Sequence, residues 1–384
     1  MKKWTIFSLF LFILVFAGGC SPQKEEYGYR EFYLDMAFSI VPKVQVVDTI
    51  TKLEELDDLR NELSEITTRL DNVFSTTKET SYLSLINEQA GVAPVTVPED
   101  VIIVLKEAIA VARESIVDEV ALYDVTIYPV WELWNFSAKY YHELEDNRET
   151  IPNPQDIINR LPLVDYTKII IDEVNSTVYL TDENMKIDLG SIVKGYACDL
   201  IKTYLLEQGI TRATIDVGGN LLTYGANFYN DSDQPWKIKI QTPYVSQYQP
   251  NYWDNYFLGT YYDTDVTVVS SGTYERYIKT EEGVDYHHIL DPRTGYSFDN
   301  GLISVTIITE ISMFADAYST AVFSMGLESG MEFIEGKEEL EAVFVTKNKE
   351  IYVSSGLEEA FLFNNNIENI GYTYKGVYDG TSNS

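Results

Sequence analysis

Helix patterns and strand patterns follow one another along this chain without an internal repeat or a long linker. Residues 51–75 place leucine and isoleucine at helical spacing and predict one amphipathic helix, and residues 98–116 predict a second helix that begins at a proline and two acidic residues. A shorter helix is expected within residues 152–164. Alternating or β-branched runs predict strands at residues 33–46, 166–181 (a hairpin), 212–225, 236–243, 266–272, 302–308, 341–347 and 350–355. This mixture predicts a single α+β unit.

The charge of the chain limits its partners. The 384 residues carry 28 Lys and Arg against 60 Asp and Glu, which gives a net charge of −32. A surface this acidic repels phosphate backbones, so we expect no nucleic-acid binding. A substrate that carries phosphates would need a cation inside the site.

The first 20 residues have the pattern of a bacterial export signal. Two lysines precede an apolar run over residues 4–17, and two glycines lead from this run to Cys20. The run is short for a membrane span. The segment resembles a bacterial lipobox, with Ala17 where such boxes usually carry leucine. An uncleaved anchor, or an ordinary signal with a chance cysteine, is the alternative interpretation.

The lipobox interpretation divides the chain into four parts. We expect a signal peptide at residues 1–19, a polar tether at residues 20–31 that begins with lipidated Cys20, a folded domain at residues 32–363 and a tail at residues 364–384. The protein would then be anchored by lipid to the extracytoplasmic face of the cell membrane. The second of the two cysteines, Cys198, would have no partner within the chain, and its apolar surroundings predict a core position.

Residues 186–209 predict the end of a strand, a tight turn and a helix closed by glycine. Free amide groups at the start of a helix favour anions. Asp188 in the turn can accept from a hydroxyl or a base, Lys194 can reach a phosphate, and Gly195 allows the helix to pack closely. A turn that serves only packing is an equally good interpretation of this segment taken alone.

Residues 313–326 place a carboxylate and a hydroxyl on one helix face. Asp316 and Thr320 are four apart, and their neighbours are small or apolar. Both side chains offer hard oxygen ligands, which suit Mg²⁺ and not zinc. The alternative is an Asp that caps a neighbouring element and a Thr packed in the core.

Two further segments carry candidate groups. Residues 268–295 contain Ser270 and Ser271 on a strand, and then the adjacent pair His287 and His288 before a turn with Pro and Gly. Neighbours on a strand point to opposite faces, so only one of the two histidines can enter a given site. The sequence contains no GxSxG motif, so a serine hydrolase of that type is poorly supported. The aromatic run at residues 122–134 can stack on a flat ring or form core.

The order and spacing of these segments resemble the ApbE family of bacterial FAD:protein FMN transferases. The segments that carry the resemblance are Met36, STTKETSYLSLIN, LYDVTIYPVWELW, DLGSIVKGYACD, DVGGNLLTYG, SSGTYERYI, HILDPRTGYS and ADAYSTAVFSMG. They lie within residues 32–363. The resemblance implies a single α+β flavin transferase domain of the T-fold-like type.

The resemblance also implies a reaction. FAD would bind with Mg²⁺ at its pyrophosphate, a Thr or Ser hydroxyl of an acceptor protein would attack the FMN phosphorus, and AMP would leave. The implied acceptor is an exported FMN-binding-domain protein of a redox or electron-transfer system. Transfer of a phosphoryl group needs charge neutralisation and positioning, both of which a metal supplies.

The site residues are expectations from the resemblance alone. The implied ligands of Mg²⁺ are the side chains of Asp316 and Thr320 and the main-chain carbonyls of Ser191 and Ser319. The implied FAD contacts are Met36, Leu122, Tyr123, Asp124, Asp188 and Leu290. Lys194 would contact the incoming substrate, and His288 would help to deprotonate the acceptor hydroxyl.

The chain departs from the family pattern at a few positions. Ala37 and Phe38 follow Met36 where the family has Gly and Thr, and Thr77 stands where an aromatic residue is usual. A ring that stacks on FAD could instead come from residues 244–262, a tyrosine-rich stretch without a clear period that predicts an inserted loop or loose hairpin.

Two other functions remain open at this stage. The same site could hydrolyse FAD to FMN and AMP with water in place of the acceptor. A lipid-anchored FAD-binding protein without catalysis is the second alternative, which the departure at Thr77 favours and the intact Asp316 and His288 oppose.

Overall fold

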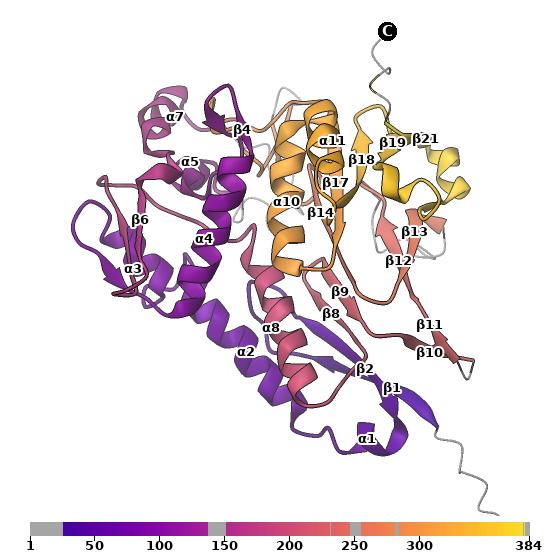
Figure 1. Ribbon diagram of the computed structural model, residues 1–384. Coiled ribbons are helices and arrows are strands. Elements are labelled where there is room, and N and C mark those ends of the chain that lie inside the picture. Colours follow the sequence, from indigo (N-terminus) through magenta and orange to yellow (C-terminus); the bar gives the residue numbers. More distant parts are fainter. Residues whose placement is uncertain are drawn as a thin grey trace, which may run out of the picture.

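A nine-stranded sheet forms the centre of the fold (Figure 1). The computed structural model describes residues 26–136, 151–230, 232–245, 255–280, 284–378 and 380. In spatial order the strands are β1 (Tyr27–Tyr33), β2 (Lys43–Thr49), β8 (Ala213–Val217), β9 (Asn220–Tyr224), β14 (Val266–Gly272), β17 (Leu302–Thr309), β18 (Glu341–Thr346), β19 (Glu350–Val353) and β21 (Thr373–Val377). Neighbouring strands are antiparallel except β19 and β21, which are parallel.

The other strands form small sheets and hairpins. One sheet contains β12 (Trp236–Gln241), β13 (Phe257–Asp263) and β20 (Leu362–Phe363), and another contains β3 (Val95–Thr96), β7 (Thr177–Leu180) and β6 (Ile169–Asp172). The hairpins are β4 (Ile116–Val117) with β5 (Val120–Ala121), β10 (Asn227–Tyr229) with β11 (Ser232–Gln234), and β15 (Tyr277–Lys279) with β16 (Asp285–His287).

Helices cover one face of the central sheet (Figure 1). The α-helices are α1 (Ile50–Glu54), α2 (Leu59–Phe74), α3 (Tyr82–Glu88), α4 (Glu99–Glu114), α5 (Tyr128–Trp134), α7 (Pro154–Arg160), α8 (Val193–Glu207), α10 (Ser312–Met325) and α11 (Leu327–Glu335). The 3₁₀ helices are η1 (Val125–Ile127), η2 (Leu161–Leu163), η3 (Tyr166–Lys168), η4 (Ser355–Leu357) and η5 (Asn365–Ile370). α8 and α10 pack on the sheet and on each other, and α4 packs on α10.

The central strands separate two apolar cores. Val269 of β14 and Ile307 of β17 lie in the core under the helices, whereas Val268 and Ile308, one residue away, lie in the core under β12 and β13. This alternation follows from the two-residue period of a strand. β17 is buried along its whole length, which explains why its sequence is apolar throughout.

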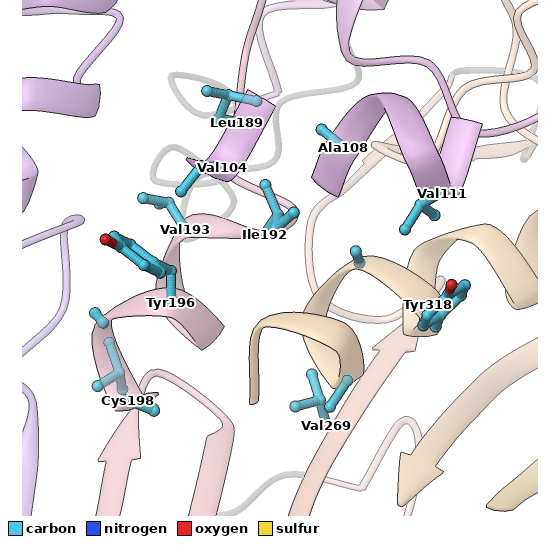
Figure 2. Packing of buried hydrophobic residues seen from close by; sticks show 14 of the residues in the cluster. Val104, Ala108, Val111, Leu189, Ile192, Val193, Tyr196, Cys198, Val269 and Tyr318 are labelled. Carbon is cyan, nitrogen blue, oxygen red and sulfur yellow. The ribbon is translucent and has the colours of Figure 1, made fainter. Parts of the chain in front are cut away.

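Figure 2 shows part of the helical core, to which α4, α8 and α10 all contribute side chains. Val104 and Ala108 come from α4, and Tyr318 comes from α10. Cys198 of α8 is fully buried in this layer, as its sequence context predicts. The beginning of α8 is therefore held rigidly beside α10, which is where the candidate site lies.

Most predicted elements are confirmed. The helix expected at residues 98–116 is α4, the helix expected within residues 152–164 is α7, and the hairpin expected at residues 166–181 is β6 and β7. Gly218 and Gly219 adopt φ of 63° and 90° in the turn between β8 and β9, a conformation that glycine adopts without strain.

The single helix expected at residues 51–75 is wrong, because α1 and α2 are separate. Arg30 of β1 donates to the carbonyl of Leu53 at 2.8 Å and to Asp57 at 3.0 Å. The end of α1 is thus bonded to the neighbouring strand, and aspartates with low helix propensity follow it.

The single strand expected at residues 33–46 is also wrong. β1 and β2 are antiparallel partners, and the chain reverses between them through Phe38 and Ser39, whose φ angles are 53° and 62°. Non-glycine residues with positive φ mark a turn, which the apolar composition of this stretch conceals.

The domain extends beyond the boundaries predicted at residues 32 and 363. β1 begins in the predicted tether, and β21 lies in the predicted tail. Both are edge strands, and their mixed polar composition is typical of that position. The predicted signal peptide and Cys20 lie outside the described residues. Within the described part, no helix combines the length and apolar character needed to cross a membrane.

The tyrosine-rich stretch at residues 244–262 is only partly a loop. Residues 246–254 lie outside the described residues. From Phe257 the chain forms β13, which pairs with β12 and covers the central sheet. This half of the predicted insertion therefore belongs to the core of the fold.

Candidate active site

The turn before α8 is held by side chains. Asn87 of α3 accepts from the N–H of Ile187 at 2.7 Å and donates to its carbonyl at 3.0 Å. The predicted strand ending at Ile187 is absent, because this amide makes the two bonds that a neighbouring strand would make. Asp188 follows, donates through its N–H to the Val125 carbonyl at 3.0 Å and accepts from Gly190 at 2.9 Å.

Asp316 and Lys194 lie together where α8 meets α10. The buried Asp316 carboxylate has Oδ1 3.2 Å from Lys194 Nζ and accepts through Oδ2 from the N–H of Gly195 at 3.0 Å. With its amide oriented to suit both neighbours, Asn220 accepts from Lys194 at 2.9 Å and donates to Asp316 at 3.3 Å. The partners that a buried carboxylate requires are thus present.

Hydroxyl groups surround this pair. Ser271 Oγ of β14 lies 2.8 Å from Ser319 Oγ and 3.2 Å from Thr320 Oγ1. Ser191 Oγ lies 3.0 Å from the hydroxyl of Tyr123. Asp316 and Thr320 lie on one helix as predicted, and the structure brings Asp316 close to α8 and β9 and brings Thr320 close to β14.

Gly195 allows the close approach of α8 to α10. A Cβ at this position would lie 2.1 Å from the carbonyl oxygen of Ser312, which is main chain and cannot move aside. We expect Gly195→Ala to lower the free energy of unfolding by about 3 kcal/mol or more. Thermal or urea unfolding measures this. Gly336→Ala is the control, because its Cβ would meet only ordinary contacts from 3.4 Å; equal stability of the two variants would contradict the prediction.

His288 follows β16 and bonds to the loop before β15. The N–H of His288 donates to the Arg276 carbonyl at 3.0 Å, and ring Nδ1 lies 3.2 Å from the same oxygen. A carbonyl only accepts, so Nδ1 carries the proton and Nε2 keeps its lone pair. Burial, assisted by the charge of Arg276, lowers the pKa of His288 to about 3. The ring is therefore neutral at neutral pH and can accept a proton at Nε2.

His287 serves the fold instead. Its Nε2 lies 2.9 Å from the carbonyl of Phe298, and the ring packs edge-on against Phe323 with centroids 5.7 Å apart. Burial lowers the pKa of His287 to about 4. Only one of the two adjacent histidines is available to a ligand, in agreement with the strand alternation.

The turn after His288 is rigid. The Asp291 carboxylate accepts from the N–H of Arg293 at 2.9 Å and from its guanidinium at 2.7 Å, and the Asp291 carbonyl accepts from Gly295 at 2.7 Å. The indole N–H of Trp134 in α5 donates to the Gly295 carbonyl at 2.9 Å. The turn thus fixes the chain directly after His288 against α5.

Comparison with known proteins agrees with this arrangement. A sequence model of the ApbE family matches residues 38–344. The chain belongs to the ApbE family. It is 33% identical over 309 residues to the FAD:protein FMN transferase of Klebsiella pneumoniae (strain 342), covering 80% of this chain and 88% of the relative. It is 27% identical over 346 residues to the FAD:protein FMN transferase of Vibrio cholerae, covering 88% and 92%.

The solved structures show the same fold. The ApbE protein of Thermotoga maritima superposes with a TM-score of 0.72 at 29% identity, over 87% of this chain and 99% of that one. The flavin transferase ApbE of Vibrio cholerae superposes with a TM-score of 0.70 at 24% identity, over 88% and 100%. The predicted α+β flavin transferase fold is confirmed.

The side chains expected to contact FAD in this ApbE family member differ in exposure. Met36 is 70% exposed, whereas Leu122, Tyr123 and Leu290 are buried. Leu290 packs in the aromatic cluster around Trp134. A contact from Leu290 to FAD would therefore use its main chain, and the hydroxyl of Tyr123 reaches the site through Ser191.

The two aspartates expected at FAD have different surroundings. Asp124 accepts from the N–H and hydroxyl of Thr126 at 2.8 and 2.6 Å and from the N–H of Tyr166 at 2.9 Å. Burial raises the pKa of Asp124 to about 6. This carboxylate orders the loop that carries Tyr123. Asp188 accepts from Gly190 and is half-buried, so it has capacity left for a ligand.

A pocket of about 350 Å³ lies at the position where the family carries an aromatic residue. Its lining residues are Thr76, Thr77, Glu79, Ser84 and Glu88. Tyr128 at the start of α5 stacks on Trp131 with centroids 5.9 Å apart, and the nearby Thr76 side chain opposes the rise that burial causes in the pKa of Tyr128. In the predicted insertion, Tyr244 bonds Thr273 at 2.5 Å.

The oxygen donors around Asp316 fit Mg²⁺. This ion takes one or two carboxylates from a protein and keeps other positions for phosphate and water. Asp316 supplies one carboxylate and Thr320 a hydroxyl. Because the N–H of Gly195 donates to Asp316, the Ser191 carbonyl, four residues earlier, is left available. The Ser319 carbonyl lies inside α10, so only its second lone pair remains for a cation.

Proposed function

We propose that this chain transfers FMN from FAD to a Thr or Ser hydroxyl of an acceptor protein and releases AMP. The observation that carries the proposal is a neutral His288 whose Nε2 has no hydrogen-bond partner within the described residues and whose pKa is also lowered by the charge of Lys194. The relatives named FAD:protein FMN transferases support the same reaction.

The reaction uses the residues of the site as follows. The acceptor hydroxyl gives its proton to Nε2 of His288, and its oxygen forms a bond to the FMN phosphorus. The bond from this phosphorus to the oxygen of the AMP phosphate breaks, and AMP leaves with the electron pair. Lys194 supplies positive charge at the diphosphate, which the net negative charge of the protein would otherwise repel.

Asp316, Thr320 and the Ser191 carbonyl would hold Mg²⁺, with the Ser319 carbonyl as a fourth ligand. When bound, the ion neutralises charge on the diphosphate oxygens. Asn220 would keep the Asp316 carboxylate in place, because it bonds both Asp316 and Lys194.

We also propose where the enzyme is located and which class of protein accepts FMN. Lipid on Cys20 would anchor the enzyme at the extracytoplasmic face of the cell membrane, and the acceptor would be an exported FMN-binding-domain protein of a redox or electron-transfer system. The sequence pattern of the first 20 residues supports the anchor.

The test combines the chain from Ser21 with FAD, Mg²⁺ and an FMN-binding-domain acceptor. We expect the intact mass of the acceptor to increase by one FMN, and EDTA to prevent the increase. An acceptor whose target hydroxyl residue is replaced by alanine is the control. An unchanged acceptor with accumulating FMN and AMP would identify a hydrolase, and intact FAD would identify a binding protein.

A further inference from the structure

An arginine outside the set of site residues expected from the resemblance is bonded to His288 through its main chain. Arg276 precedes β15, and its carbonyl accepts both the N–H and ring Nδ1 of His288. β15 pairs with β16 so that Tyr277 lies opposite His287. The hairpin and the two hydrogen bonds together fix the main chain of Arg276 relative to His288.

The loop that leads to Arg276 begins at Ser271, which contacts hydroxyl groups of α10 near Asp316. Ser271 contacts Ser319 and Thr320 at 2.8 and 3.2 Å. The N–H of Thr273 donates to the Ile303 carbonyl of β17 at 2.9 Å, which ties the loop to the central sheet. The loop from Ser271 to Arg276 therefore joins the proposed metal ligands to the proposed base.

The guanidinium of Arg276 is exposed, and no carboxylate of the described residues lies within ion-pair distance of it. Elsewhere in the described chain, arginines hold aspartates in the pairs Arg30–Asp57, Arg60–Asp35, Arg212–Asp233 and Arg293–Asp291. In a protein with a net charge of −32, an arginine without such a partner is available to an anion.

The charge of Arg276 acts on groups of the candidate site. Burial raises the pKa of Asp188, and the positive charge of Arg276 opposes this rise. The charges of Arg276 and Lys194 both lower the pKa of His288. Two cations from different segments therefore act on the same ring, Arg276 from the loop before β15 and Lys194 from α8.

We propose that Arg276 binds the diphosphate of the flavin nucleotide, with its guanidinium on the non-bridging oxygens of the phosphoryl group that is transferred. A planar guanidinium offers two parallel N–H groups that match two phosphate oxygens. This inference rests on the proposed function. As the acceptor proton moves to His288 Nε2 and the bond to AMP breaks, Arg276 holds the charge on these oxygens.

The test compares Arg276→Gln and Arg276→Lys in the mature chain with wild type. The control is Arg113→Gln, because Arg113 is an exposed arginine of α4 that also lacks an ion pair within the described residues. Calorimetric titration with FAD, ADP and riboflavin in the presence of Mg²⁺ measures each Kd, and thermal unfolding checks the fold.

We expect Arg276→Gln to raise the Kd for FAD and for ADP about 10- to 100-fold and to leave the Kd for riboflavin, which has no phosphate, unchanged. The Kd values of Arg276→Lys for FAD and ADP should lie between those of wild type and Arg276→Gln, because lysine keeps the charge and loses the paired N–H groups. Unchanged binding of FAD and ADP would overturn the inference, and so would equal losses for all three ligands.

The outcome is independent of whether the acceptor is modified. If Arg276→Gln weakens FAD and ADP binding while wild type modifies no acceptor, the Arg276 site stands and the proposed function fails. If wild type modifies the acceptor and Arg276→Gln does so with the same Kd and kcat, the proposed function stands and the Arg276 site fails.

Discussion

Replacing His288 with alanine is expected to lower kcat for FMN transfer about 10²- to 10⁴-fold and to leave the Kd for FAD nearly unchanged. The Nδ1 proton of His288 is committed to the Arg276 carbonyl, so Nε2 is the atom that can take the acceptor proton. Mass analysis of the acceptor over time gives the rate, and quenching of flavin fluorescence gives the Kd.

An asparagine variant separates catalysis from loop support. Alanine removes the base and also the hydrogen bond from Nδ1 to the Arg276 carbonyl. The side-chain N–H of asparagine can donate to this carbonyl, but asparagine cannot act as a base. We therefore expect His288→Asn to be as slow as His288→Ala. A near-normal rate in His288→Asn would show that His288 acts only by positioning the Arg276 loop.

The pH dependence gives a second check on His288. Burial and the neighbouring charges of Arg276, His287 and Lys194 lower the pKa of His288 to about 3. The neutral ring, which is the form that we propose acts as the base, therefore predominates above that pH. Protonation of His288 should cause no loss of kcat/KM between pH 5 and pH 7, and a loss centred on the ordinary histidine pKa of about 6.5 would contradict this environment.

The parts of the fold with strong local periodicity could be predicted from the sequence. α4 and the hairpin β8–β9 carry clear apolar periods or a pair of glycines, and both are present. The prediction of a strand ending at Ile187 failed because a distant residue replaces a regular partner. The two hydrogen bonds of Ile187 come from Asn87, 100 residues earlier, and no local pattern reports such a pairing.

In the candidate site, too, some residues could be predicted from the sequence and others depend on tertiary packing. The four-residue spacing of Asp316 and Thr320 placed them on one helix face, and the resemblance indicated Lys194. Asn220 stands in a motif that the resemblance includes, yet its bonds to Lys194 and Asp316 depend on the packing of β9 against α8 and α10. Arg276 also stands in such a motif, but only the β15–β16 hairpin places it beside His288.

Replacing Asp316 with asparagine is expected to abolish Mg²⁺ binding and to lower the transfer rate by about 10³-fold or more. The two side chains have nearly the same shape, and the amide oxygen can still accept from the N–H of Gly195. The fold should therefore persist, while the negative charge that attracts the cation is lost. Titration with Mg²⁺ measures the first effect, and acceptor mass analysis measures the second.

Asp199→Asn is the matched control for Asp316→Asn. The Asp199 carboxylate accepts from the N–H groups of Ser312 and Met313 at the start of α10 at 2.9 and 2.8 Å, so it supports the same helix without facing the hydroxyl groups around Thr320. We expect this control to lower Tm and to keep the Mg²⁺ Kd. A ligand that binds only the folded state raises Tm, so Mg²⁺ should stabilise wild type and Asp199→Asn but not Asp316→Asn. If Asp316→Asn responds to Mg²⁺ as wild type does, the carboxylate serves only to pair with Lys194, and the metal lies elsewhere.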